Sequence, residues 1–210
     1  MPAWRERPRS RPDVPAARPH ASTNAWRQVP NALSAARLLA GPLLIALALL
    51  HQERIFAVLL IAALATDVID GWLARRFGVQ SALGASLDSA ADVVMLICAA
   101  AGVAAFHRDV WHEHAVAIGS VLTGWGVVCA FALLRYRRLS SFHTYASKLA
   151  GYALGFFIIS LFAFEFVPWL FYWAIVLSVA ASAEELLLLW QLPLWRADVR
   201  GLYWVLREKS

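Results

Sequence analysis

Long apolar runs alternate with short polar connections along most of the chain. Each run holds about 20 mostly apolar residues, the length that an α-helix needs to cross the hydrocarbon core of a membrane. The strands of a membrane barrel would alternate polar and apolar residues, and these runs do not. The pattern therefore predicts an all-α polytopic membrane protein with six transmembrane helices. Their expected ranges are 32–50, 55–76, 83–106, 115–134, 146–166 and 168–191.

The composition agrees with a chain that lives in lipid. Of its 210 residues, 60% are hydrophobic and 16% are charged, whereas a soluble domain carries about 25% charged residues. The two cysteines, Cys98 and Cys129, both lie inside apolar runs. We interpret them as small buried hydrophobic residues rather than as a disulfide or a metal clip.

The first 28 residues differ from the rest because they are rich in Arg and Pro and have no apolar core of their own. Such a segment cannot bury enough surface to fold, so we predict a disordered cytoplasmic arm over residues 1–28. A basic arm beside a membrane domain is expected to lie against anionic lipid rather than to bind nucleic acid. The predicted organisation continues with a transmembrane domain over 29–192 and a cytoplasmic tail over 193–210.

The basic residues predict the orientation of the chain. With the N-terminus in the cytoplasm, 17 of the 19 Lys and Arg residues fall on the inner side, and only Arg54 and Arg108 fall outside. Lys and Arg accumulate in cytoplasmic loops, so we expect a protein of the inner (cytoplasmic) membrane with both termini in the cytoplasm. The inner ends of the second and third spans are then the ends that carry acidic residues.

Four aspartates interrupt these two spans: Asp67, Asp70, Asp88 and Asp92. Residues three or four apart share one face of a helix, so each helix presents two carboxylates toward one point. Four like charges partly out of water cannot all stay ionised without cations. Carboxylate oxygens suit Mg²⁺, Mn²⁺ or Ca²⁺ rather than zinc, and no His or Cys lies within the cluster. The spacing therefore predicts a divalent-metal site.

Small residues lie on the same face as these acids. Gly71, Ala74 and Gly84 would let a bulky group approach the backbone, and Arg75 at the membrane surface could hold a phosphate. Divalent ions, an arginine and a small-residue floor together describe a diphosphate site, since charge neutralisation is the main help that phosphoryl transfer needs.

The complete pattern is Asp67-x2-Asp70-Gly71-x2-Ala74-Arg75-x8-Gly84-x3-Asp88-x3-Asp92, with eight fixed positions over 26 residues. It resembles, position for position, the signature of the CDP-alcohol phosphotransferase family of integral membrane enzymes. The first span opens with "PNALSAARLLAGP" (residues 30–42) and resembles the family's usual opening, with Ser34 in place of the commoner Thr. The resemblance covers about residues 29–192.

The resemblance implies a reaction. Such enzymes transfer a phosphatidyl group from a CDP-linked lipid, usually CDP-diacylglycerol, to an alcohol and release CMP in phospholipid biosynthesis. Asp67, Asp70 and Asp88 would then hold the metals, two ions of Mg²⁺ or Mn²⁺ per site. Asp92 would ligate the second metal or act as the general base toward the acceptor hydroxyl. The residues expected near the CDP donor are Asn31, Gly71, Ala74, Arg75 and Gly84.

Basic residues between the fourth and fifth spans are candidates for binding a phosphorylated acceptor. Lys148 lies just inside the fifth span, and Arg135 and Arg138 precede it. The alternative is that they only anchor the inner membrane face. Arg37 is a further candidate. An Arg about five residues inside the first span must either snorkel to the surface or pair with a phosphate or an aspartate. Asn31 is either a helix cap or a nucleotide contact.

Several alternatives stay open at this stage. Glycerol 3-phosphate is the most ordinary acceptor for a chain of this length, but serine, inositol phosphate and choline fit the same pattern. A cation transporter that uses the intramembrane aspartates is a rival function, as is an inactive family member that acts as a scaffold. Intramembrane acids do mark ion paths. The acids here crowd at one end of their helices, however, which favours the enzyme. Small-residue faces suggest a homodimer.

Overall fold

Helices form the regular structure of the chain in the computed structural model, which describes residues 29–77, 82–137 and 144–191 together with Leu202 and Arg207. The expectations for residues 1–28 and for most of 193–210 lie outside these residues. Seven helices follow one another along the described part. They are α1 (Val29–Leu49), α2 (Glu53–Phe77), α3 (Ala82–Phe106), α4 (Arg108–Glu113), α5 (Ala115–Tyr136), α6 (Tyr145–Ala163) and α7 (Pro168–Gln191).

The six long helices coincide with the six apolar runs, which confirms the all-α fold. Five of them contain a stretch long and apolar enough to cross a membrane: Asn31–Leu49, Ser86–Phe106, Ala115–Tyr136, Tyr145–Ala163 and Pro168–Gln191. The remaining long helix, α2, has 25 residues and carries the first two aspartates. At 1.5 Å per residue its length of about 37 Å exceeds the hydrocarbon thickness. Helix α2 is thus long enough to cross a membrane, but it is not among these five helices. Its membrane crossing, the second of the six predicted spans, stays a prediction.

Two connections between the long helices differ from the sequence prediction. Residues 107–114, which join the third and fourth predicted spans, contain the short helix α4, which has Asp109 in its first turn and His112 in its last. Val110 and Trp111 of α4 pack against the main hydrophobic core, but two apolar residues in six are too few for a periodicity argument to detect. The predicted fifth span was also too long, because α6 ends at Ala163 and Pro168 then starts α7, a position that suits proline.

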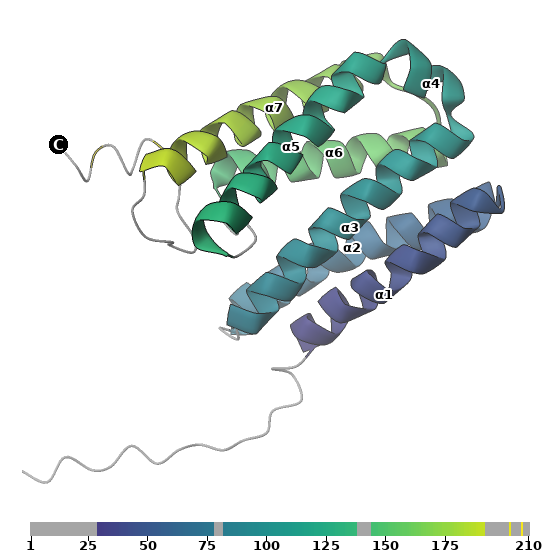
Figure 1. The fold of residues 1–210 in the computed structure, drawn as a ribbon. Coiled ribbons are helices and arrows are strands. Elements are labelled where there is room, and N and C mark those ends of the chain that lie inside the picture. Colours follow the sequence, from purple (N-terminus) through teal and green to yellow (C-terminus); the bar gives the residue numbers. More distant parts are fainter. Residues whose placement is uncertain (1–28, 78–81, 138–143, 192–201, 203–206, 208–210) are drawn as a thin grey trace, which may run out of the picture.

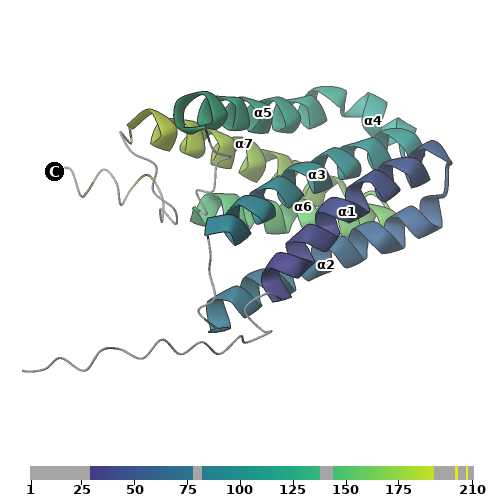
Figure 2. The ribbon, with the colours of Figure 1, turned by 60° about the horizontal axis from the view of Figure 1, so that its bottom comes forward.

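The long helices run up and down, so their connections collect at two ends of the bundle (Figure 1). One end holds the starts of α1, α3 and α6 and the ends of α2, α5 and α7 (Figures 1 and 2). The opposite end holds α4 and the α1–α2 and α6–α7 corners (Figures 1 and 2). Arg54 and Arg108 lie in the first residues of α2 and α4, at the α4 end, whereas Arg76 and Arg135 lie at the other end. This separation agrees with the charge sorting made from the sequence.

The main hydrophobic core lies between α1, α2, α3, α6 and α7. Phe56 of α2 is fully buried and its ring contacts the rings of Phe106 and Phe162 at centroid distances of 5.3 and 5.5 Å. Cys98 is buried in this core, as predicted, and Cys129 is partly buried in α5. Helix α1 packs against both α2 and α3. This packing brings Arg37 of α1 to the aspartates of α2 and α3.

Candidate metal centre

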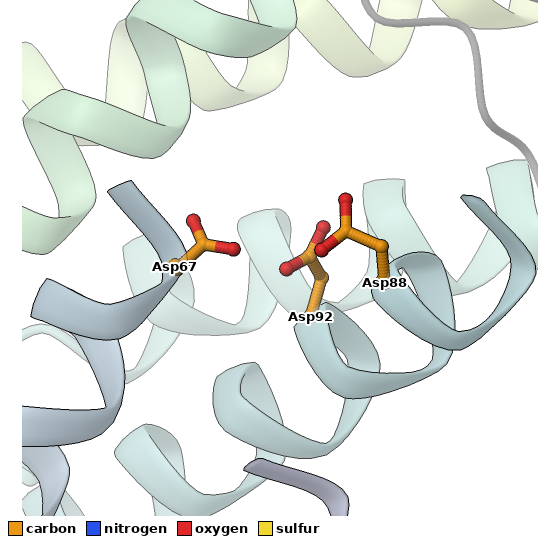
Figure 3. A group of neighbouring side chains, drawn as sticks. All are labelled: Asp67, Asp88 and Asp92. Atoms are coloured by element: carbon orange, nitrogen blue, oxygen red, sulfur yellow. The ribbon is translucent and has the colours of Figure 1, made fainter. Parts of the chain in front are cut away.

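Three carboxylates from two helices converge toward the end of the bundle where α2 ends and α3 begins. Asp67 belongs to α2, and Asp88 and Asp92 belong to α3, one helical turn apart (Figure 3). One oxygen from each of the three lies within 4.8 Å of the others. We call Asp67, Asp88 and Asp92 the carboxylate cluster. The structure thus brings together three of the four aspartates that the sequence singled out, and the side chain of Asp70 lies outside the described residues.

The carboxylate cluster is partly open to solvent. The side chains of Asp67, Asp88 and Asp92 are 42%, 28% and 47% exposed, respectively. Asp92 is therefore the most accessible of the three. Because carboxylates close to one another repel unless a cation lies between them, this group needs positive charge from the protein or from bound ions.

Arg37 of α1 supplies one such charge. Its guanidinium forms ion pairs with all three members of the cluster: Nη1 with Asp67 Oδ1, Nη2 with Asp88 Oδ1 at 2.7 Å, and Nη1 with Asp92 Oδ1 at 3.4 Å. The hydroxyl of Ser34, one turn earlier on α1, lies 3.4 Å from Nη2. The guanidinium presents its donors as a rigid planar fork with two terminal nitrogens, so it can donate to several carboxylates at once.

Arg37 is 2% exposed, and its guanidinium is paired with the aspartates instead of extending to solvent. The snorkelling interpretation of this residue is therefore wrong, and the alternative of pairing with the aspartates is correct. A charge buried to this extent is stable only when it is paired, which is the case here. The sequence left both interpretations open because it does not show which helices are neighbours.

The donor set fits a hard divalent cation. Two ligand oxygens on opposite sides of such an ion lie about 4 to 5 Å apart, since each bond to oxygen is about 2.0–2.6 Å long. The three oxygens of the carboxylate cluster lie within 4.8 Å of one another, so all three could contact one such ion. Carboxylate oxygens without nitrogen or sulfur ligands favour Mg²⁺, Mn²⁺ or Ca²⁺. The described residues therefore could hold one metal ion with Asp67, Asp88 and Asp92.

The residues predicted to lie near a CDP donor are only partly described. Gly71 and Gly84 are half-buried on α2 and α3, the two helices that carry the cluster. The side chains of Ala74 and Arg75 lie outside the described residues. Asn31 is the third residue of α1, so it does not occupy the N-cap position and the cap interpretation is not supported. Its role as a nucleotide contact stays a prediction.

The predicted acceptor residues lie at the same end of the bundle as the cluster. Lys148 is half-buried in the first turn of α6, whose N-cap residue Thr144 accepts a hydrogen bond from the backbone N–H of Ser147 at 3.1 Å. Arg135 is exposed in the last turn of α5, with its guanidinium carbon 5.6 Å from the ring centroid of Tyr136. Arg138 lies outside the described residues.

Comparison with known proteins shows which protein family the chain resembles. A family model described as CDP-alcohol phosphatidyltransferase matches residues 27–180, which is most of the chain. This segment contains the carboxylate cluster, Arg37 and the predicted acceptor residue Lys148.

Two curated relatives carry names from the same field. A Schizosaccharomyces pombe protein named cardiolipin synthase (CMP-forming) / mitochondrial hydrolase fusion protein is 31% identical over 119 residues, which cover 56% of this chain and 19% of that protein. A Mycobacterium leprae protein named CDP-diacylglycerol–serine O-phosphatidyltransferase is 30% identical over 115 residues, which cover 55% of this chain and 35% of that protein. The chain thus spans only 19% and 35% of the length of these two relatives. No solved structure matches the chain.

Proposed function

Since this chain belongs to the CDP-alcohol phosphatidyltransferase family, we propose that it transfers a phosphatidyl group from a CDP-linked lipid such as CDP-diacylglycerol to a small alcohol. The observation that carries the proposal is the carboxylate cluster, in which α2 and α3 present three acidic side chains toward one point. A cluster of this kind at one end of a bundle of apolar helices suits a substrate with a lipid tail and a charged diphosphate.

The residues that would hold two Mg²⁺ or Mn²⁺ ions are Asp67, Asp70, Asp88 and Asp92. When bound, such ions neutralise the charge of a diphosphate. Gly71 and Gly84 would leave room for the diphosphate beside the backbone, and Arg75 would contact its oxygens. Ala74 and Asn31 would lie near the nucleotide.

Asp92 is proposed as the general base. Its side chain is the most exposed of the cluster, and its 3.4 Å contact with Arg37 is longer than the 2.7 Å contact of Asp88. A carboxylate that is accessible to solvent can take a proton from a bound hydroxyl. The acceptor oxygen then bonds to the phosphorus of the phosphatidyl group, the bond from that phosphorus to the CMP oxygen breaks, and CMP leaves.

The acceptor is proposed to be a phosphorylated alcohol, with glycerol 3-phosphate as the first choice. Lys148 and Arg135 lie at the cluster end of the bundle, where their charges would attract a phosphate. Arg138 is proposed to help them. The sorting of basic residues supports a cytoplasmic membrane protein whose site faces the cytoplasm, with both termini on that side. Assembly as a homodimer is also proposed.

A direct assay tests the reaction. Protein purified in detergent is mixed with CDP-diacylglycerol, Mn²⁺ and one alcohol at a time from glycerol 3-phosphate, serine, inositol phosphate and choline. We expect CMP to appear only with one acceptor and only with the divalent ion. The Asp92→Asn variant should lose activity while it keeps its fold. Cation uptake into liposomes without CMP release would instead favour the transporter, and absence of both activities would favour a scaffold.

A further inference from the structure

Arg37 and the predicted metal ions require the same three carboxylates. The guanidinium takes an oxygen from Asp67, from Asp88 and from Asp92, and it is 2% exposed. It therefore lies inside the group of oxygens rather than at its rim. A divalent ion bound by the same group would be a close neighbour of a permanently charged side chain, since an arginine does not lose its proton in proteins.

We propose that Arg37 is a built-in counterion that competes with divalent cations for the carboxylate cluster. While Arg37 is paired, it offsets the repulsion between the three carboxylates and joins α1 to α2 and α3. Loading of an ion weakens these pairs, because like charges repel and because each carboxylate has a limited number of lone pairs to share. The competition sets the affinity of the site for its metal. This inference rests on the metal site of the proposed function.

The competition predicts a thermodynamic signature that a merely structural arginine would not give. A ligand that binds only the folded state raises its stability by an amount that grows with affinity. Without Arg37 the carboxylates repel one another, so the ion-free protein loses stability. The ion then relieves that repulsion and no longer has to displace a guanidinium. Removal of Arg37 should therefore lower the melting temperature in EDTA and raise the affinity for Mn²⁺.

The test compares the wild type with Arg37→Gln, using full-length protein in detergent. Free Mn²⁺ is measured by electron paramagnetic resonance during a titration, and melting temperatures are recorded in EDTA and at rising Mn²⁺ concentrations. We expect half-saturation of Arg37→Gln at an Mn²⁺ concentration at least about tenfold lower than in the wild type. The rise in melting temperature from EDTA to saturating Mn²⁺ should also be larger than in the wild type.

Two further variants complete the design. Arg108→Gln removes the same charge from an exposed position at the α4 end and should leave the Mn²⁺ titration unchanged. Arg37→Lys keeps a positive charge, and it replaces Arg37→Gln in the titration and the melting experiments if Arg37→Gln does not fold. A lysine has one terminal nitrogen where Arg37 pairs through two, Nη1 and Nη2. The Mn²⁺ concentration at half-saturation of Arg37→Lys should therefore fall between those of the wild type and Arg37→Gln.

The outcomes separate the two proposals. Wild-type binding of Mn²⁺ with unchanged or weaker binding by the Arg37 variants would overturn the competition and leave the proposed metal site in place. If Arg37→Gln melts below the wild type by the same amount in EDTA and in saturating Mn²⁺, Arg37 has only a structural role. Absence of Mn²⁺ binding by every protein, wild type included, would overturn the metal site and the competition together.

Discussion

Gly41 of α1 lies directly against Val94 of α3, so close that a Cβ at position 41 would overlap with Cγ1 of Val94. Gly41 is one turn beyond Arg37 on the same face of α1, because residues four apart align along a helix. The missing side chain therefore sets the distance between α1 and α3 near the contact of Arg37 with Asp88 and Asp92.

This contact gives the first prediction. Gly41→Ala should lower the free energy of unfolding by about 1–3 kcal/mol, because overpacking forces helices apart. It should also reduce CMP release, since α1 would move away from the cluster. Thermal unfolding and the CMP assay provide the measurements. Gly119→Ala is the matched control, because a Cβ there meets no atom within 4 Å. If both variants behave alike, the close approach of α1 and α3 is not important.

The second prediction concerns the carboxylate cluster. Asp88→Asn should reduce both Mn²⁺ affinity and CMP release by on the order of 100-fold or more, since even residues behind a ligand cost 10- to 100-fold when they are replaced. The Mn²⁺ titration and initial rates of CMP release measure the two effects. Asp109→Asn, on the exposed surface of α4, is the control for loss of one carboxylate. Full activity of Asp88→Asn would contradict the metal site.

The third prediction follows from His107, which lies between α3 and α4, outside the membrane-spanning segments. Burial lowers the pKa of this imidazole from its usual value of 6.5, and the negative charge of Glu53, 3.9 Å away, only partly offsets the effect. Between the lowered pKa and 6.5 the unfolded chain binds more protons than the folded one. The stability that His107 contributes is therefore present above pH 6.5 and is lost as the pH falls through the lower, folded pKa.

Replacement of His107 should remove this part of the pH dependence. We expect His107→Gln to show a smaller loss of melting temperature than the wild type when the pH is lowered from 7.5 to 5.5, both values being about one unit from the usual histidine pKa. Differential scanning fluorimetry in detergent measures the melting temperatures at the two pH values. His112→Gln, at an exposed position of α4, serves as the control. A pH profile that does not change in His107→Gln would contradict the burial effect.

The sequence predicted the long helices well because the thickness of a membrane imposes a length on apolar segments. It missed α4 because six residues give too short a pattern, and here the pattern is polar. It also placed the start of the first helix three residues too late, at 32 rather than Val29, since Pro30 and Asn31 gave no apolar signal there. Helix ends depend on local hydrogen bonding that hydropathy does not report.

The site was predicted in composition but not in arrangement. The spacing of Asp88 and Asp92 along one helix was sufficient to put them on one face. The role of Arg37 could not be decided, because its carboxylate partners lie 30, 51 and 55 residues away in the sequence. Such contacts depend on which helices pack together. The signal that could have favoured pairing was the high cost of an unpaired arginine inside an apolar run.

The fourth prediction concerns the start of α6. Thr144 is fully buried, and its hydroxyl accepts a hydrogen bond from the backbone N–H of Ser147 at 3.1 Å. Thr144→Ala should lower the free energy of unfolding by about 1 kcal/mol, the usual cost of losing an N-cap. Thr144→Ser keeps the hydroxyl and should recover most of the loss in a thermal unfolding experiment. Equal losses in the two variants would assign the effect to the missing methyl group instead.

The last prediction tests how the acceptor is recognised. Lys148 lies one turn into α6, at the end of the bundle that also holds the carboxylate cluster. If its ammonium binds the phosphate of the acceptor, Lys148→Gln should raise the KM for glycerol 3-phosphate about tenfold, the loss of roughly one charge-assisted hydrogen bond, and leave kcat nearly unchanged. The KM for the CDP-linked donor should stay constant, because the donor is proposed to bind beside Gly71, Arg75 and Gly84 instead. Arg54→Gln, at the opposite end of the bundle, is the control for a lost charge. A fall in kcat with no change in KM would contradict an acceptor-binding role and place Lys148 in the chemical step, because an interaction made only in the transition state has that kinetic effect.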